Sequence, residues 1–300
     1  YKRQLFLFPP LKFFFKFLSE KHLKKLFELR ILSYDYVYNY AIHRKKRKKI
    51  MSSYDPDKFY LNIGGGLNEN KKNWRILEYC GDPILRIGYR YHRELIDYNV
   101  DLMAKKKWAI NDNSVDLIYT SHCLEHLTQD ATNFVFAETR RVLKNNGIFR
   151  ISVPDVDLAY KALTNNDSSF FNSFQSNEEL LTKKFDDKIL DSIEAKFLKF
   201  FCAFKPNPEN FNTIKSDIKN LKKDDLLDKY RDNQTIQNNY HDHLNWFNYQ
   251  KLKKLAVNHG FNSEKVILSK KNASISEEMR SPEFDKTAPN YSVFVDILKS

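Results

Sequence analysis

The sequence predicts an α/β fold in which short buried strands alternate with turns and helices. Two observations carry this prediction. Short apolar runs recur between residues 58 and 155, and most of them end at glycine or polar residues. Three of the seven glycines in the chain are consecutive, Gly64, Gly65 and Gly66, and they directly follow the first of these runs. Such clustering is typical of a loop where the backbone must approach a ligand closely.

The first two predicted strands flank the glycines. Residues 59–63 form a short apolar run, and residues 74–78 form a second run that ends on an acid, Glu78. Nucleotide-binding α/β sheets hold a ribose-containing cofactor with this arrangement, in which a strand is followed by a glycine loop and then by a strand that ends in a carboxylate. A glycine-rich hairpin turn is the plainer interpretation. The alternating elements downstream favour the cofactor loop.

The remaining elements follow in order along the chain. Asp112-Asn113-Ser114 reads as a turn, and we expect Asn145-Asn146-Gly147 to end a helix as a left-handed cap. Gly260 is expected to cap a later helix. The predicted strands are 95–102, 115–121, 148–153, 266–268 and 291–298, a corner is expected at 122–127, and the predicted helices are 131–143 and 249–259.

Composition narrows the class of protein. An apolar fraction of 42% with 15% aromatic residues is typical of a globular chain. The three cysteines show no CxxC spacing, which argues against a disulfide framework or a zinc ribbon and fits a reducing compartment such as the cytoplasm. Of the net charge of +12, residues 1–50 contribute +11, with 14 basic and 3 acidic residues. The rest of the chain is nearly neutral and lacks a basic stripe, so nucleic acid is not the expected partner.

Residues 1–57 form a basic, aromatic leader with a helical apolar face that includes Phe14, Phe15 and Leu18. Arg44–Lys49 is a run of six consecutive bases, which we expect to be solvated. The leader suits an interfacial helix on an anionic membrane, at its inner face. A helical cap packed on the main domain, with its charges in water, is the simpler interpretation and the one that we slightly favour.

Residues 156–240 are charged and mostly helical, without strand alternation, and we interpret them as an insert in a domain that spans residues 58–300. Ile193, Phe197, Phe200 and Phe201 form a helical stripe ahead of Pro206. Such a stripe is typical of a core, here that of a lid.

Six segments follow one another along the chain: LNIGGG, WRILE, DNSVDLIYTSHCLEHL, ETRRVLKNNGIFRISVPD, HLNWFNYQKLKKLAVNHGF and YSVFVDILK. In this order they resemble class I S-adenosylmethionine-dependent methyltransferases. Within these they are similar to the methyltransferase type 11 group, especially its bacterial branch associated with surface polysaccharides. The resemblance covers residues 58–155 and 240–300.

The resemblance implies a Rossmann-like, seven-stranded sheet whose last strand is antiparallel. It implies that Gly64, Gly65 and Gly66 meet the methionine part of S-adenosylmethionine and that Glu78 accepts the ribose hydroxyls. Asp101 would lie by the adenine amine, and Ser121 would face the methyl group. Asn62 stands where many relatives carry an acid.

Two histidines are candidate catalytic residues, His122 first and His243 second. The cofactor supplies an activated methyl, so the protein must align the acceptor and remove a proton if the acceptor is a hydroxyl. An imidazole suits that proton transfer. Equally, His122 is a residue that orders its loop. His126 is expected to be structural.

Three other functions compete with this one. His122, Glu125 and His126 match the H-x-x-E-H zinc-hydrolase pattern, and the HxH pair at 241–243 offers a further ligand. A strand running up to Ser121 puts His122 at a corner instead of on a helix, so we expect no metal. A dinucleotide dehydrogenase is a second alternative, but its fingerprint requires a third glycine where residues 68–70 have none. It also requires an acid later in the chain than Glu78. A non-catalytic S-adenosylmethionine-binding protein, tethered to membrane or RNA by the leader, also fits.

The sequence therefore predicts a methyltransferase that acts on a small-molecule or saccharide hydroxyl or amine. By analogy with the family, we expect the acceptor to belong to cell-envelope biosynthesis.

Overall fold

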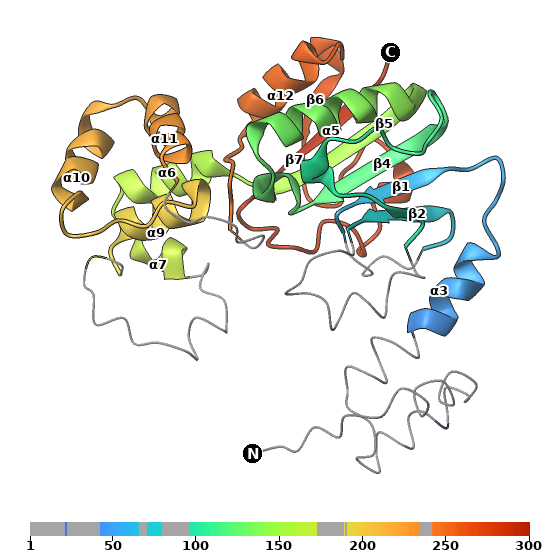
Figure 1. Cartoon of the computed structure of the whole chain (residues 1–300), viewed down its shortest axis with the longest axis horizontal. Helices are drawn as coiled ribbons and strands as arrows, with labels where there is room; N and C mark the ends of the chain where they lie inside the picture. The colour runs from blue at the N-terminus through green and yellow to red at the C-terminus, as the bar shows by residue number, and fades with distance from the viewer. Residues whose placement is uncertain are drawn as a thin grey trace. The chain divides into compact units, whose positions relative to one another are not determined.

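The computed structural model describes residues 22, 43–65, 71–79, 96–172, 189, 191–234 and 242–300. The chain divides into two compact units, Tyr1–Asp101 and Leu102–Ser300. The strands form a seven-stranded sheet in the order β3-β2-β1-β4-β5-β7-β6 (Figure 1). The first unit contains α3 (His43–Met51), β1 (Tyr60–Ile63), β2 (Trp74–Glu78) and β3 (Tyr98–Asn99).

The strands of the first unit run parallel, with β2 between β1 and β3. All four residues of β1 are buried, as the apolar run predicts. The second strand also lies where it is predicted, with Glu78 as its last residue. The third strand is shorter than predicted. Only two residues of the run pair with β2, and Leu102 begins a 3₁₀ turn, η3 (Leu102–Ala104).

The basic run at the end of the leader is not wholly solvated, which corrects the prediction. Arg47 is fully buried, and its guanidinium donates to the backbone oxygen of Trp74 at 2.9 Å and pairs with the carboxylate of Asp97. The same carboxylate accepts from the Ile76 amide at 2.7 Å and from the Tyr54 hydroxyl at 3.1 Å. Burial, and next the charge of Asp97, raise the pKa of Tyr54 well above its ordinary value. α3 is therefore fastened to β2 by a buried ion pair.

The strands of the second unit form a mixed sheet. β4 (Val115–Ser121) has the bounds that the sequence predicts, and it runs parallel to β5 (Leu143–Pro154). The last strand, β7 (Ser292–Leu298), lies between β5 and β6 (Val266–Ser269) and is antiparallel to both. The structure thus confirms the predicted seven-stranded sheet with an antiparallel last strand.

The predicted helix cap at residues 145–147 is wrong. α5 (Gln129–Val142) ends earlier, and Leu143 already starts β5. Asn146 does adopt the left-handed conformation, with φ at 63°, but within an irregularity of the strand. A Cβ on Gly147 would lie 2.8 Å from the Leu143 side chain, so only glycine fits there.

Two helices lie side by side over one face of these strands (Figure 1): α5 and α12 (Tyr249–Asn258). Phe136 of α5 stacks on His259, with ring centroids 6.0 Å apart. Gly260 follows with φ at 84°, and its backbone N–H donates to Val257, which confirms its predicted capping role.

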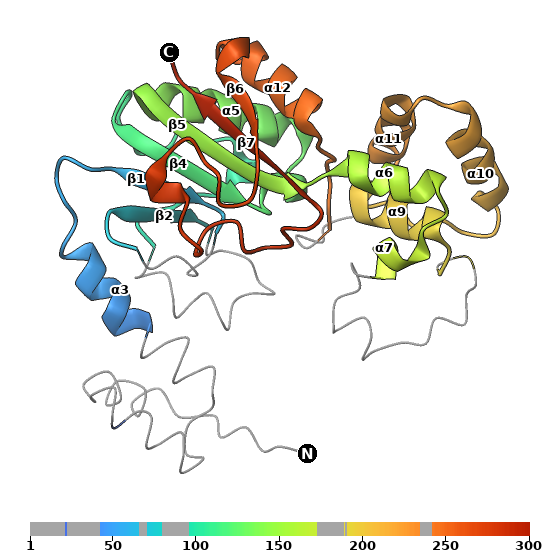
Figure 2. The same cartoon turned by 180° about the vertical axis from the view of Figure 1, so that it is seen from behind.

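The segment between β6 and β7 covers the opposite face of the strands (Figure 2). It contains the 3₁₀ turn η6 (Glu277–Met279) and is held by Arg150 of β5. The Arg150 guanidinium lies 2.6 Å from the Asp285 carboxylate and 3.0 Å from the Asp296 carboxylate. All three side chains are buried, so the segment is tied to β5 and β7 by charges that water does not screen.

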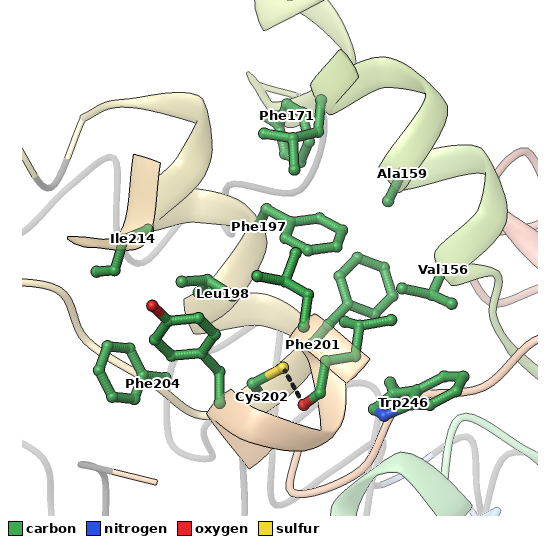
Figure 3. Packing of buried hydrophobic residues seen from close by; sticks show 14 of the residues in the cluster. Val156, Ala159, Phe171, Phe197, Leu198, Phe201, Cys202, Phe204, Ile214 and Trp246 are labelled. Atoms are coloured by element: carbon green, nitrogen blue, oxygen red, sulfur yellow. Dashed lines mark hydrogen bonds between the residues drawn. The ribbon is translucent and has the colours of Figure 1, made fainter. Parts of the chain in front are cut away.

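The helices that follow β5 build a separate core around the predicted aromatic stripe (Figure 3). Phe197 and Phe201 of α9 are buried, with ring centroids 5.4 Å apart. α9 begins at the Ser192 cap and ends at Ala203, in the left-handed region, three residues ahead of Pro206. The helices are α6 (Val156–Thr164), α7 (Ser168–Asn172), α9 (Ile193–Cys202), α10 (Phe211–Asn220) and α11 (Lys223–Asp232).

The chain before α12 is fastened to this core. The indole of Trp246 donates to Asp228 of α11 at 3.0 Å. The ammonium of Lys251 lies 3.8 Å from the centre of the Trp246 ring and donates to Asn245 at 2.7 Å. Burial lowers the pKa of Lys251 to about 7. No helix within the described residues is long and apolar enough to span a membrane.

The Arg47 ion pair generates a stability prediction. Replacing Arg47 with Met removes one partner and leaves the Asp97 carboxylate buried, which we expect to cost about 3–5 kcal/mol of unfolding free energy. Lys46→Met, on the exposed neighbour, is the matched control and should change stability by less than about 0.5 kcal/mol. Urea denaturation measures both. Equal stability of the two variants would show that the pair contributes nothing.

Lys251 generates a pH prediction. Above pH 7 the folded protein loses the Lys251 proton, while the unfolded chain keeps it up to its ordinary pKa of 10.5. The unfolded state therefore binds more protons in this window, and this residue makes stability rise with pH. Urea denaturation between pH 7.5 and 8.5 gives the slope of the unfolding free energy against pH. For Lys251→Met this slope should lie below that of the parent by up to about 1.4 kcal/mol per pH unit. Identical slopes would contradict the prediction.

Candidate functional site

The glycine turn of the first unit begins where β1 ends. Gly64 adopts a positive φ of 66°, and its N–H donates to the Leu77 oxygen at 3.0 Å. A Cβ on Gly65 would meet the Asn62 side chain at 2.3–2.7 Å, so a side chain there would displace the asparagine. Gly66 lies outside the described residues. Both positions therefore require glycine, Gly64 for its backbone conformation and Gly65 for the close approach of the Asn62 side chain.

Asn62 is the strongest sign of a ligand in this unit. Its side chain is fully buried, and among the described residues neither its amide oxygen nor its amide nitrogen has a hydrogen-bond partner. A buried amide without partners is costly, and the cost is removed when a ligand supplies a donor or an acceptor. The amide packs against Gly65, so the orphaned atoms fit a polar ligand bound at the glycine turn.

Two carboxylates predicted to bind the cofactor follow neighbouring parallel strands. Glu78 is the last residue of β2, and its side chain accepts from the Tyr79 amide at 3.0 Å. The Val100 amide donates to the Glu78 backbone oxygen at 3.0 Å, so the chain after β3 still runs beside the end of β2. Asp101 is the next residue. Both carboxylates therefore lie at the carboxyl edge of the first unit's strands, the edge where α/β sheets bind ligands.

The second unit has its own unsatisfied hydroxyls at the carboxyl end of β4. Ser121, the last residue of β4, pairs in register with Ser152 of β5. The hydroxyl oxygens of both serines are buried, and neither has a hydrogen-bond partner in the part of the chain that the structure describes. Sequence reasoning singled out Ser121 and missed Ser152. The signal for Ser152 is its register with Ser121, which only the pairing of β4 with β5 reveals.

His122 turns the corner after β4 with φ at 49°, a left-handed conformation that is uncommon for residues other than glycine. Its backbone N–H donates to Ser152 at 2.9 Å. The side chain is held at both ring nitrogens, because Nδ1 lies 3.1 Å from a Glu125 oxygen and Nε2 lies 2.8 Å from the Ser292 hydroxyl. Ser292 was missed by sequence reasoning, since it lies 170 residues away. This geometry favours the interpretation of His122 as a residue that orders the corner.

Glu125 lies in the 3₁₀ turn η4 (Leu124–His126) and is 1% exposed. Burial acts to raise the pKa of this carboxyl, but the contact with His122 outweighs the effect of burial. The pKa of Glu125 therefore lies below its ordinary value. The turn thus holds a buried carboxylate that is ionised at neutral pH.

His126 and His243 meet next to that carboxylate. Their ring centroids lie 4.8 Å apart at an interplanar angle of 77°. The Nδ1 atom of His243 is buried and has no hydrogen-bond partner, and burial lowers the pKa of this imidazole to about 4. His243 is therefore neutral at pH 7. The first histidine of the predicted HxH pair, residue 241, lies outside the described residues.

One family of proteins matches part of the chain: residues 89–151 match the model of a methyltransferase domain. The matched residues include Asp101, Ser121, His122 and Glu125. This segment of the chain is therefore similar to a methyltransferase domain. No curated protein matches the chain.

Solved structures show only weak similarity. An S-adenosylmethionine-dependent methyltransferase from Aquifex aeolicus is 10% identical with a TM-score of 0.36, over 94% of this chain and 100% of that one. A TehB-like methyltransferase from Corynebacterium glutamicum is 20% identical, TM-score 0.27, over 36% and 61%. A phosphoethanolamine N-methyltransferase from Haemonchus contortus, bound to S-adenosyl-L-methionine, is 14% identical, TM-score 0.35, over 85% and 52%. At these TM-scores the similarities carry no argument.

Proposed function

We propose that this S-adenosylmethionine-dependent methyltransferase methylates a hydroxyl or amine of a small molecule or saccharide. The observation that carries the proposal is the matched methyltransferase domain together with the orphaned amide of Asn62 beside the glycine turn. The near-neutral body of the chain supports a small acceptor over nucleic acid. A role in cell-envelope biosynthesis rests on the resemblance alone.

Within the first unit, we propose that Gly64, Gly65 and Gly66 contact the methionine part of the cofactor. Glu78 would accept hydrogen bonds from both ribose hydroxyls, and Asp101 would lie by the adenine amine. In the second unit, we propose the buried Ser121 hydroxyl as a further cofactor contact, because it has no hydrogen-bond partner within the described ranges. Each of these groups is a donor, an acceptor or bare backbone, as a polar nucleoside requires.

When bound, the cofactor supplies a methyl group on a positively charged sulfur. The protein must therefore orient the acceptor and accept the proton of a hydroxyl. His122 stays the first candidate for that proton, because it follows the carboxyl end of β4 and its Nδ1 atom lies 3.1 Å from the Glu125 carboxylate. His243 is the second, and its burial makes it the poorer proton acceptor.

We further propose that the leader makes a peripheral contact with an anionic membrane at the inner face. Its net charge of +11 supports this, while the buried Arg47 shows that part of the basic run serves the fold instead.

Glu78 tests the cofactor site. Replacing Glu78 with Ala removes two charge-assisted hydrogen bonds to the ribose and should weaken S-adenosylhomocysteine binding by about 2–4 kcal/mol, measured by calorimetry. Asp57→Ala, an exposed carboxylate of the same unit, is the matched control and should bind like the parent. Unchanged affinity in a folded Glu78→Ala protein would remove this residue from the site.

The leader is tested by deleting residues 1–42, which spares α3 and the Arg47 ion pair. Each base near an anionic surface contributes about 1 kcal/mol, screened by salt. The parent should sediment with phosphatidylserine vesicles at low salt, ignore phosphatidylcholine vesicles, and lose binding on deletion while keeping cofactor affinity. A parent that is indifferent to anionic vesicles would exclude the membrane contact. A deletion that only lowers the melting temperature would favour a packed cap.

A further inference from the structure

The buried carboxylate of Glu125 is under-compensated by the protein. In the described part of the chain, its one close polar contact is His122 Nδ1, 3.1 Å from one oxygen, and neither oxygen accepts an aligned hydrogen bond. An ionised carboxylate removed from water needs hydrogen bonds, a paired charge or a metal ion. One imidazole contact leaves most of its lone pairs unsatisfied.

Two imidazoles present nitrogen atoms to the same place. His126 contacts the Asp242 backbone oxygen through Nδ1 at 3.2 Å. A carbonyl oxygen only accepts hydrogen bonds, so Nδ1 of His126 carries the hydrogen. The free lone pair of the ring therefore lies on Nε2. This hydrogen bond also fixes the ring orientation, as a carbonyl commonly does for histidines that bind metals.

His243 is arranged in a similar way. Its ring hydrogen-bonds to the backbone of Phe200, and its Nδ1 atom is buried without a partner. The Phe200 ring packs on the His243 ring with centroids 4.3 Å apart, which holds the imidazole in place. Beside it, Asp242 has a buried oxygen, Oδ2, that also lacks a hydrogen-bond partner. The neighbourhood therefore has an excess of acceptors and a shortage of positive charge.

We propose that Glu125, His126 and His243 bind a divalent transition-metal ion. One potential ligand atom from each residue lies within 4.8 Å of those of the other two. Ligands of a tetrahedral zinc ion bound at 2.0–2.1 Å lie about 3.4 Å apart, so the side chains must close by about 1 Å or somewhat more around the ion. Because the three ligands are on η4 and the chain before α12, the ion ties these two segments together.

The ligand types decide which ion binds. Two imidazoles and one carboxylate suit zinc and its neighbours in the first transition row, whereas magnesium and calcium take oxygen ligands. Three protein ligands leave a coordination position open, as in catalytic zinc sites. His122 contacts Glu125 from outside the ligand set and acts as a positioning residue for the carboxylate.

This inference replaces the expectation that the HCLEH motif binds no metal. The motif supplies two ligands, Glu125 and His126, and the third comes from the HxH pair far along the chain, while His122 is not a ligand. The inference does not depend on the methyl acceptor or on cofactor binding.

The test is calorimetric titration of the full chain, first stripped with a chelator, with zinc chloride. We expect one zinc per chain and a higher melting temperature in its presence. Cobalt(II) should bind at the same site and give visible absorption bands. Glu125→Gln, His126→Gln and His243→Gln should each weaken zinc binding at least 10-fold, and excess magnesium should not displace the ion.

His259→Gln is the matched control, because this half-buried imidazole lies at the end of α12 and contacts Asn133. It should bind zinc like the parent. Circular dichroism and melting of the metal-free variants show whether each one is folded. A parent that binds no zinc, or a stoichiometric zinc that persists in all three folded ligand variants, would overturn the proposal.

Discussion

Much of the second unit depends on the buried ion pairs that Arg150 forms with two carboxylates. It joins β5 to β7 through Asp296 and holds the segment before β7 through Asp285. Ser292, the first residue of β7, then meets the ring of His122. The position of the catalytic candidate is therefore set by an ion-pair network on a different strand. Removing the buried guanidinium would leave both carboxylates without their paired charge, with only neutral donors such as the Asn272 amide and the Ser274 hydroxyl, so the network works as a unit.

The strands were predictable because their cause is local. β4 is buried along most of its length, so its apolar run marks both of its ends. The Asn145–Gly147 turn was misread because a helix cap and a strand irregularity both use a left-handed residue. The hydrogen bonds to the end of the chain distinguish the two structures. The Asn146 amide donates to the Lys299 oxygen, and the Lys299 amide donates to the Gly147 oxygen, as in a strand pair.

The polar groups were harder to predict, because their partners are distant in sequence. Arg47 looked like one base among six, and its burial depends on Asp97, 50 residues away. The glycine turn and the strand-end acids follow from local pattern, so Gly64 and Glu78 are where the sequence puts them. The orphaned amide of Asn62 follows from burial, which the sequence indicated only as part of an apolar run.

The corner after β4 shows how a single buried charge organises a site. The Glu125 carboxylate can be balanced by a protonated imidazole or by a metal ion, and these states compete because a metal ligand must be a neutral imidazole. His126 and His243 present lone pairs and so suit the metal. His122 is already held at both ring nitrogens, which keeps it outside the ligand set. The roles of the three histidines therefore follow from which of their ring nitrogens already contact the backbone or Ser292. A methyl acceptor bound here would meet a charge that depends on whether the metal is present.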